Sequence, residues 1–247
     1  MKYNEFEKMS EQGTTHCWYV ARRALLVHEL RKLSQSSIGL KILDIASACG
    51  DSIVVCSNYG KTFGIDVSWD AIKYCKQKNI ETILRGDAHN LPFKSDSFDI
   101  VVALDVFEHL EDDIASMKEI ERVLKSEGKL IFNVPAFMFL FSYHDLAFHH
   151  FRRYKAEELK QKLEQAKFQI NYLTYWSFFI FPAIFVMRKL FNFKNKLHGE
   201  THSDFHLNVP LLLQKILKFL NFVEFVFIKK GISLPFGVSL YGVARKE

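Results

Sequence analysis

Short apolar runs in the first 110 residues each lead into an aspartate and give way to a segment of helical periodicity. Strand-like and helix-like stretches that alternate in this way are typical of a doubly wound parallel sheet. In such a sheet the ligand binds at the carboxyl ends of the strands. Four of the predicted ends carry an acid, at Asp44, Asp66, Asp87 and Asp105. The sequence therefore predicts an α/β fold whose binding edge is lined by carboxylates.

The periodicity of apolar residues places the elements of this sheet. Continuous or alternating apolar runs indicate strands, whereas apolar residues three and four apart indicate helices. The predicted strands are 41–45, 62–66, 80–84, 98–105 and 128–134, and the predicted helices are 16–33, 50–59, 68–78, 111–125 and 155–167.

The C-terminal part of the chain differs from the rest in charge and aromatic content. Residues 1–150 hold 17 Lys and Arg against 21 Asp and Glu, whereas residues 151–247 hold 16 against 7. Of the 24 phenylalanines, 19 lie from Phe132 onward. A basic and aromatic segment suits a membrane surface, an anionic lipid or a fatty pocket, and it is equally compatible with an ordinary core.

Two apolar stretches lie in this C-terminal part, at 172–187 and 209–228. The first contains Pro182, and charged residues interrupt the second, so neither resembles the run of about 20 apolar residues that a spanning helix needs. We expect a lid, a dimer face or a pair of interfacial helices instead. The polar stretch 198–204 is expected to be a mobile loop.

Several classes of protein are disfavoured by the sequence. The four cysteines form no CxxC pair, which speaks against a zinc ribbon and against a disulfide-stapled module. The N-terminus is acidic and polar, unlike a signal peptide. The basic excess is diffuse, so no nucleic-acid partner is expected. We expect a cytoplasmic protein, with association to a membrane left open.

Five segments in register carry a resemblance to a known family. They are ILDIASACG (42–50), GID (64–66), GDAHNLPF (86–93), SFDIVVALDVFEHL (97–110) and EIERVLKSEGKL (119–130). Together they resemble class I S-adenosylmethionine-dependent methyltransferases of the type 11 kind. The resemblance implies a Rossmann-like, doubly wound, mainly parallel seven-stranded sheet with an N-terminal helical cap and a Phe-rich helical insertion. A nicotinamide-binding sheet is the competing class, which the GDAxxLPF and EHL blocks disfavour.

The same resemblance implies the residues that bind S-adenosylmethionine. Asp66 would accept hydrogen bonds from the ribose hydroxyls, Asp87 from the adenine amino group, and the Ala88 N–H would reach a ring nitrogen. Ala46 and Ala48 stand where the family has glycine. Alanine suits this turn if φ stays negative at both positions; the alternative is that it narrows the pocket and weakens binding. The expected cofactor-binding residues are Asp44, Ala46, Ala48, Gly50, Asp66, Val67, Asp87, Ala88, Leu104 and Asp105.

The candidates for catalysis follow the fifth predicted strand. The stretch VPAFMFLFSYHDLAFHHFRRY (134–154) resembles the signature of a bacterial branch of these enzymes, as does HCWYVARR (16–23). An acceptor hydroxyl must lose its proton during methyl transfer, so His144 or His150 would be the base. Alternatively, the cluster fixes the loop by hydrogen bonds. The catalytic candidates are His144, His150, Asp145 and Tyr154, and the substrate candidates are His16, Arg22, His109, Arg152 and Arg153.

Two further readings concern the arginines and a metal. Arg152 and Arg153 would hold an anionic group of the substrate, or else pair with acids of the protein itself. Asp105, Glu108 and His109 lie at i, i+3 and i+4, a spacing that also suits a metal ion, with His144 or His150 completing the set. Related sequences use the same Glu and His to cap a helix, so we expect S-adenosylmethionine as the cofactor and no metal.

The whole chain, 1–247, is expected to form one methyltransferase domain. It would comprise a helical cap (1–37), a cofactor-binding core (38–170), a hydrophobic helical insertion or lid (171–230) and a final strand (231–247). The predicted function is methyl transfer to O or N of a small acceptor that is hydrophobic or linked to a lipid or sugar, in secondary metabolism or in lipid or glycan modification. A homodimer and a peripheral membrane contact are the other partners considered. The alternative is a catalytically degenerate protein that binds a partner or membrane through its basic, Phe-rich part.

Overall fold

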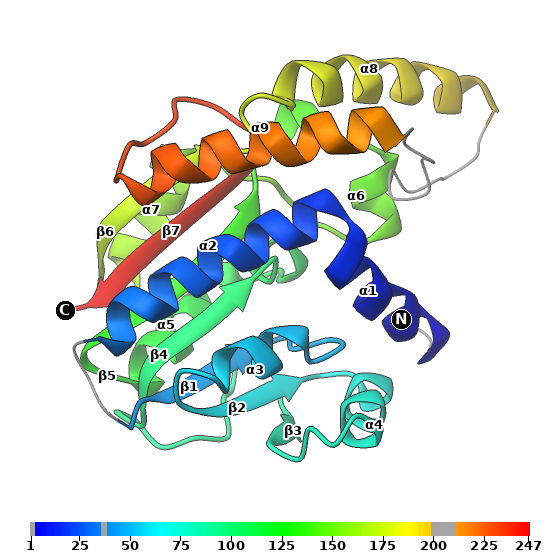
Figure 1. Cartoon of the computed structure of the whole chain (residues 1–247). Coiled ribbons are helices and arrows are strands. Elements are labelled where there is room, and N and C mark those ends of the chain that lie inside the picture. Colours follow the sequence, from blue (N-terminus) through cyan, green and yellow to red (C-terminus); the bar gives the residue numbers. More distant parts are fainter. Residues whose placement is uncertain (1–2, 36–38, 199–210) are drawn as a thin grey trace.

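A twisted seven-stranded sheet forms the centre of the molecule (Figure 1). The computed structural model describes residues 3–35, 39–198 and 211–247. The strand order is β3-β2-β1-β4-β5-β7-β6; the first five strands are parallel, and β7 runs antiparallel to both of its neighbours. The strands are β1 (Lys41–Ile45), β2 (Lys61–Asp66), β3 (Ile83–Arg85), β4 (Phe98–Leu104), β5 (Leu124–Pro135), β6 (Phe168–Trp176) and β7 (Ser239–Lys246).

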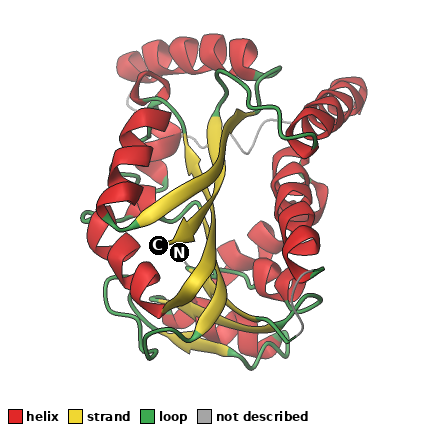
Figure 2. Cartoon of the chain, turned by 90° about the vertical axis from the view of Figure 1, so that its left-hand side faces the viewer, coloured by secondary structure: helices red, strands yellow, loops and turns green. Residues whose placement is uncertain are grey.

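Helices cover both faces of this sheet, as the turned view shows (Figure 2). α2 and α9 pack side by side on one face, and α5 and α7 pack on the other. The helices are α1 (Tyr3–Thr15), α2 (Cys17–Ser34), α3 (Asp51–Cys56), α4 (Trp69–Gln77), α5 (Asp113–Val123), α6 (Tyr143–Ala147), α7 (Ala156–Gln165), α8 (Phe181–His198) and α9 (Leu211–Lys229), with 3-10 turns η1 (Phe107–His109) and η2 (Met138–Leu140).

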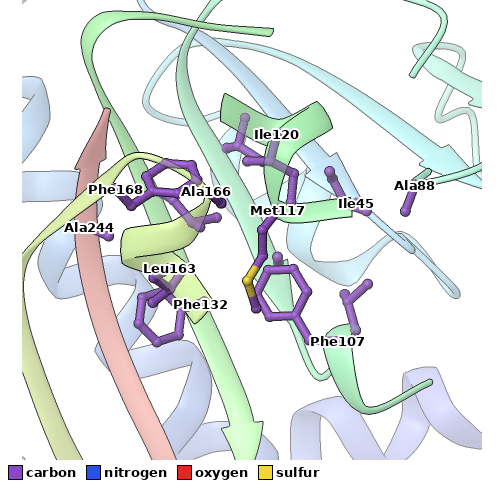
Figure 3. Packing of buried hydrophobic residues seen from close by; sticks show 14 of the residues in the cluster. Ile45, Ala88, Phe107, Met117, Ile120, Phe132, Leu163, Ala166, Phe168 and Ala244 are labelled. Carbon is purple, nitrogen blue, oxygen red and sulfur yellow. The ribbon is translucent and has the colours of Figure 1, made fainter. Parts of the chain in front are cut away.

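The apolar periodicity of the sequence accounts for the two buried layers. On one face, Met117 and Ile120 of α5 and Leu163 of α7 pack against Phe132 of the sheet (Figure 3). On the other face, Leu26 and Leu30 of α2 cover Ile42 and Val102, together with Ile228 of α9. Two filled layers leave the carboxyl edge of the parallel strands as the place where polar side chains gather.

The predicted α/β architecture is confirmed, including the helical cap and the helices inserted between β6 and β7. Several boundaries differ from the prediction, and two of these differences have a clear local cause. The apolar stretch 172–187 begins inside β6, because its aromatic and β-branched residues alternate between the two faces of an edge strand. The third strand begins at Ile83 rather than at residue 80, because Asn79 adopts a positive φ of 60° and ends α4 with a turn.

The N-terminal helices and the helices inserted before β7 can also be compared with the sequence predictions. α1 was not predicted from the sequence, whereas the predicted helix at 16–33 corresponds to α2. Within the described residues, no helix is both long and apolar enough to cross a membrane. The stretch 198–204, expected to be a mobile loop, lies outside the described residues except for His198.

Candidate functional site

The turn between β1 and α3 uses an unusual backbone. Ala46 and Ala48 have φ values of 55° and 48°, and Gly50 has a φ of 79°. The condition under which alanine was expected to fit, a negative φ at both positions, is therefore not met: the chain adopts the glycine-type turn with alanine in it. A left-handed alanine is strained by about 1 kcal/mol. This strain is concentrated where the turn presents its backbone to the binding edge.

Asp44 lies beneath this turn and is shielded from solvent. Its Oδ2 accepts a hydrogen bond of 2.6 Å from the Ser52 hydroxyl of α3. Burial raises the pKa of Asp44 to about 6, despite the hydrogen bonds from Ser52 and Ser47. The chain thus has an aspartate at a buried position that destabilises the ionised form of its side chain.

Asp66, at the end of β2, joins two loops at the binding edge. Its two oxygens accept hydrogen bonds from the N–H groups of Ala48 (2.9 Å) and Ser68 (2.8 Å). A carboxylate oxygen has two lone pairs, so each oxygen can still accept one further donor. The neighbouring Val67 has 65% of its surface exposed, which leaves an apolar side chain beside the acid.

Asp87 follows β3 and faces solvent. Its Oδ1 accepts from the backbone N–H of His89 at 2.9 Å and lies 2.9 Å from the His89 ring nitrogen Nδ1. The backbone hydrogen bond from His89 lowers the pKa of Asp87, so the carboxylate is charged at neutral pH. Ala88 is buried beside it.

A chain of polar contacts closes the ends of β4 and β5. Asp105, with a φ of 57°, receives the Asn133 amide at 2.5 Å and forms an ion pair with Arg22 of α2. Asn133 in turn accepts from the Trp176 indole N–H at 2.7 Å. The Arg22 guanidinium also lies 4.9 Å from the Trp18 ring centroid, which favours a fixed orientation of the cation.

The helical cap lies over the β1–α3 turn. Arg22, Asp51, Ser52 and Leu104 contribute to a cavity of about 30 Å³ beneath α1 and α2, which is room for about one water molecule. The N-terminal helices therefore cover the end of the site that carries Asp44. His16 caps the start of α2, where its Nδ1 accepts from the Trp18 N–H at 3.3 Å.

The histidine cluster after β5 is organised by one buried carboxylate, Asp145. It accepts the Arg153 Nε–H at 2.7 Å and the Ser142 N–H at 2.8 Å, and the Arg188 guanidinium lies 3.7 Å away. His150 Nδ1 is 2.9 Å from Asp145 Oδ1. Burial alone would raise the pKa of Asp145, but these hydrogen bonds and cations lower it well below its usual range. Asp145 is therefore ionised at neutral pH.

An ionised Asp145 fixes the orientation of His150. Its partner nitrogen Nδ1 must donate to the carboxylate, so in the neutral ring Nε2 carries the free lone pair. The His150 ring lies 4.6 Å from the His109 ring, centroid to centroid, and the two are nearly perpendicular. His144 stacks instead on Phe148 at 4.8 Å, and burial lowers its pKa to about 3.

Glu108 lies next to these histidines at the end of β4. Its side chain is fully buried, and neither carboxyl oxygen has a hydrogen-bond partner in the described part of the chain. Burial, followed by the charge of Asp105, raises the pKa of Glu108 well above its usual range, so the group is protonated. Burial also lowers the pKa of His109 to about 4. Glu108 and His109 thus lie beside His150 as neutral groups, whereas Asp145 on its Nδ1 side is ionised.

The predicted metal ligands are only partly brought together. Oxygen or nitrogen atoms of Glu108, His109 and His150 lie within 4.8 Å of one another, whereas Asp105 is engaged by Arg22 and Asn133. Metal binding would release any proton that Glu108 carries, so the charge state of Glu108 does not decide between the two readings. The absence of a metal stays a prediction.

Three of the predicted site residues are engaged by acids of the protein itself. The Tyr154 hydroxyl is buried and donates to Asp113 at 2.7 Å, and its pKa is raised by burial and by this bond. Arg152 lies 3.4 Å from the same Asp113, and Arg153 binds Asp145. This matches the alternative that the arginines pair with acids of the protein, and it removes Tyr154 from the groups able to exchange a proton with a ligand.

Sequence reasoning missed four residues of these networks, namely Asp113, Asn133, Trp176 and Arg188. A signal was available for Asn133, because a lone amide inside an otherwise apolar strand calls for a buried partner. Arg188 likewise interrupts an apolar stretch.

Comparison with known proteins agrees with the geometry. Residues 43–132 match the family model of a methyltransferase domain. The chain is 29% identical over 98 residues to the uncharacterized methyltransferase YcgJ of Bacillus subtilis and 31% identical over 102 residues to a demethylmenaquinone methyltransferase of Staphylococcus haemolyticus. These matches cover 37% and 38% of this chain and 39% and 43% of those proteins. The chain thus matches about two fifths of the length of these relatives.

Solved structures extend the likeness to the whole fold. An S-adenosylmethionine-dependent methyltransferase of Thermotoga maritima, titled as a possible histamine N-methyltransferase, gives a TM-score of 0.59 at 16% identity, covering 99% of this chain and 98% of that one. The cyclase SpnF gives a TM-score of 0.58 at 18% identity, covering 93% and 81%. Residues 43–132 of this chain are therefore similar to a methyltransferase domain, and the chain has the fold of class I S-adenosylmethionine-dependent methyltransferases.

The residues at the binding edge fit S-adenosylmethionine. Asp66 and Asp87 are carboxylates with accepting capacity left for hydroxyl and amino donors, and Val67 offers an exposed apolar contact for a flat ring. A Cβ added at Gly50 would lie 2.5 Å from Ile80 and 2.9 Å from Cys75, so the third position of the turn requires glycine. The first two positions tolerate alanine, at the cost of the left-handed backbone.

We predict that Ala48→Gly stabilises the protein by about 1 kcal/mol, because glycine adopts a positive φ without strain. Urea unfolding measures the change. Ala71→Gly in α4 is the control, because glycine in a regular helix lowers stability by a similar amount. A loss of stability in Ala48→Gly would contradict the strained turn.

We predict that Asp44→Asn changes how stability depends on pH. Because the pKa of Asp44 is raised to about 6 from 3.8, its contribution to folding declines as pH rises between these values, by about 3 kcal/mol. The difference in the free energy of unfolding, Asp44→Asn minus wild type, should therefore become more positive as the pH rises from 4 to 7. The exposed Asp70→Asn serves as the control. An unchanged pH profile in Asp44→Asn would show that Asp44 is not desolvated.

Proposed function

We propose that this protein transfers a methyl group from S-adenosylmethionine to an oxygen or nitrogen of a small, hydrophobic or lipid- or sugar-linked acceptor. The observation that carries the proposal is the oriented Asp145–His150 pair, which lies next to the carboxyl end of β4. A base held in this way is required for a hydroxyl acceptor, whereas an amine needs little beyond alignment.

The cofactor would lie along the carboxyl edge from β3 to β4. Asp66 would bind the ribose hydroxyls, Asp87 the adenine amino group, and Val67 would pack on the ring. The bound cofactor supplies an electrophilic methyl group on a sulfonium. Arg22 and the helical cap would exclude water from the Asp44 end of this edge.

His150 would take up, on Nε2, the proton that the hydroxyl group of the methyl acceptor loses. Asp145 holds the opposite nitrogen, so it stabilises the imidazolium that forms. Arg153 and Arg188 keep Asp145 ionised throughout. His144, which was the other candidate for the base, stacks on Phe148 and has a strongly lowered pKa, which favours His150.

Apolar side chains near this cluster support a hydrophobic acceptor. Met138, Phe139, Leu146 and Phe151 are all exposed on the segment between β5 and α7, the same segment that carries His150. An apolar rim beside a neutral polar centre suits an acceptor with an aromatic or hydrocarbon body.

Other partner predictions are unchanged by these observations. The homodimer and the cytoplasmic location stay predictions. The degenerate alternative, a fold that only binds a partner or membrane, would have no use for a destabilising buried acid at position 44. An intact set of Asp44, Asp66 and Asp87 supports the catalytic reading.

Calorimetric titration with S-adenosylmethionine tests the cofactor site. We predict micromolar binding by the wild type and binding roughly 10- to 100-fold weaker in Asp66→Ala, because a charged acceptor of two hydroxyls is lost. Asp70→Ala, which removes an exposed acid one turn away, should bind as the wild type does. No binding by the wild type would contradict the proposal.

Methyl transfer to a panel of phenols and amines tests the base. For a hydroxyl acceptor, His150→Gln should lower kcat by roughly 100-fold or more and leave the affinity for S-adenosylmethionine unchanged. The exposed neighbour His149→Gln is the matched control. Wild-type turnover of a phenol by His150→Gln would exclude His150 as the base.

A further inference from the structure

Helix α9 presents an apolar face to solvent. Phe219 and Phe222 have 64% and 62% of their surface exposed, and Ile216 and Phe227 are exposed as well. These positions lie on one side of the helix, since residues three and four apart share a face. We call this side, from Lys215 to Lys230, the α9 outer face.

The charge of the α9 outer face has a single sign. Four exposed lysines lie between and beside the aromatic residues, at positions 215, 218, 229 and 230. The acid of the described helix, Glu224, is buried on the opposite side, where its two oxygens accept from the Phe178 N–H at 3.1 and 3.2 Å. The exposed face is therefore basic and aromatic with no compensating carboxylate among the described residues of α9.

The inner side of α9 is firmly held, so the outer face cannot turn inward. Ile228 is buried against the helices and strands of the second core layer, and the His28 and Phe225 rings lie 5.9 Å apart. The Asn221 amide donates to the Cys17 carbonyl at the start of α2, at 3.3 Å. α9 thus lies directly on α2, the helix whose Arg22 pairs with Asp105 (Figure 1).

A second copy of the chain is a poor partner for this face. In a twofold dimer the same patch meets itself, so four lysines of one copy would oppose four lysines of the other. Like charges brought together at an interface disfavour association. A partner whose surface is negatively charged and has an apolar layer beneath it would avoid the repulsion between lysines.

We propose that the α9 outer face binds the surface of an anionic phospholipid membrane. Its phenylalanines would enter the boundary between headgroups and acyl chains, while the flexible lysine side chains reach the anionic headgroups. The helix would lie in the plane of the interface, because no described helix is suited to cross the bilayer. This binding does not depend on the proposed methyl transfer.

Co-flotation with vesicles tests the proposal. The full chain is mixed with vesicles of phosphatidylcholine alone or of equal parts phosphatidylcholine and phosphatidylglycerol. We expect binding to the anionic vesicles that decreases as salt is raised. Lys215→Gln/Lys218→Gln should weaken partitioning roughly fivefold for each lysine, and Phe219→Ser/Phe222→Ser should weaken it by at least as much.

Matched variants separate this surface from general charge and hydrophobicity. Lys73→Gln/Lys76→Gln on α4 removes two exposed lysines elsewhere, and Val54→Ser on α3 removes an exposed apolar side chain, so both should bind vesicles as the wild type does. All variants should keep the affinity for S-adenosylmethionine, which shows that they fold.

Three results would overturn the proposal. One is the absence of vesicle binding by a protein that binds S-adenosylmethionine. Another is vesicle binding that the α9 variants leave unchanged. A third is a dimer in sedimentation that dissociates in Phe219→Ser/Phe222→Ser without any affinity for vesicles, which would assign the face to a second copy. Failure of cofactor binding alone would contradict the proposed function and not this surface.

Discussion

One ionised carboxylate, that of Asp145, holds together the segment between β5 and β6. It joins Ser142 at the start of α6, the Arg153 guanidinium and the His150 ring, and it draws in Arg188 from α8. Removing one partner of a buried pair of this kind leaves an uncompensated charge, which typically destabilises a protein by about 3–5 kcal/mol. The orientation of His150 and the position of α8 therefore depend on the same carboxylate, and part of the basic excess of the C-terminal half compensates it.

Four of the ten non-glycine residues with a positive φ in the described chain follow strands at the same edge of the sheet. Ala46, Ala48, Asp105 and Phe137 all have positive φ values, and they follow β1, β4 and β5 at their carboxyl ends. Strained residues persist only where the surrounding structure fixes them, and they gather at functional sites. Here the fixing contacts are visible: Asp66 binds the Ala48 N–H, and Asn133 with Arg22 binds the Asp105 side chain.

The features that the sequence predicted are those determined by residues close together in the chain. The first five strands along the chain and the acids at the ends of four of them follow from periodicity and from the family motifs, because each depends on residues near one another in the chain. The pairing of Asp145 with His150 rather than His144 does not follow, since it is decided by how α6 turns. Tyr154 looked catalytic in the sequence, but its hydroxyl is bound to Asp113, 41 residues away. The sequence also left open whether φ is negative at Ala46 and Ala48, because a contact from another strand, that of Asp66 with the Ala48 N–H, helps to fix the turn.

The fold alone does not decide the chemistry, since a cyclase shares it with methyltransferases. The proposal of an uncharged acceptor rests on the charge state of the site. His109 and His144 are neutral because their pKa values are lowered to about 4 and about 3, and Glu108 is neutral because its pKa is raised. The cations nearby, Arg153 and Arg188, are engaged by Asp145 and the main chain. An anionic acceptor would find no free cation among these groups, and a cationic one no free anion, whereas an uncharged hydroxyl or amine on an apolar body matches a neutral centre with one oriented base.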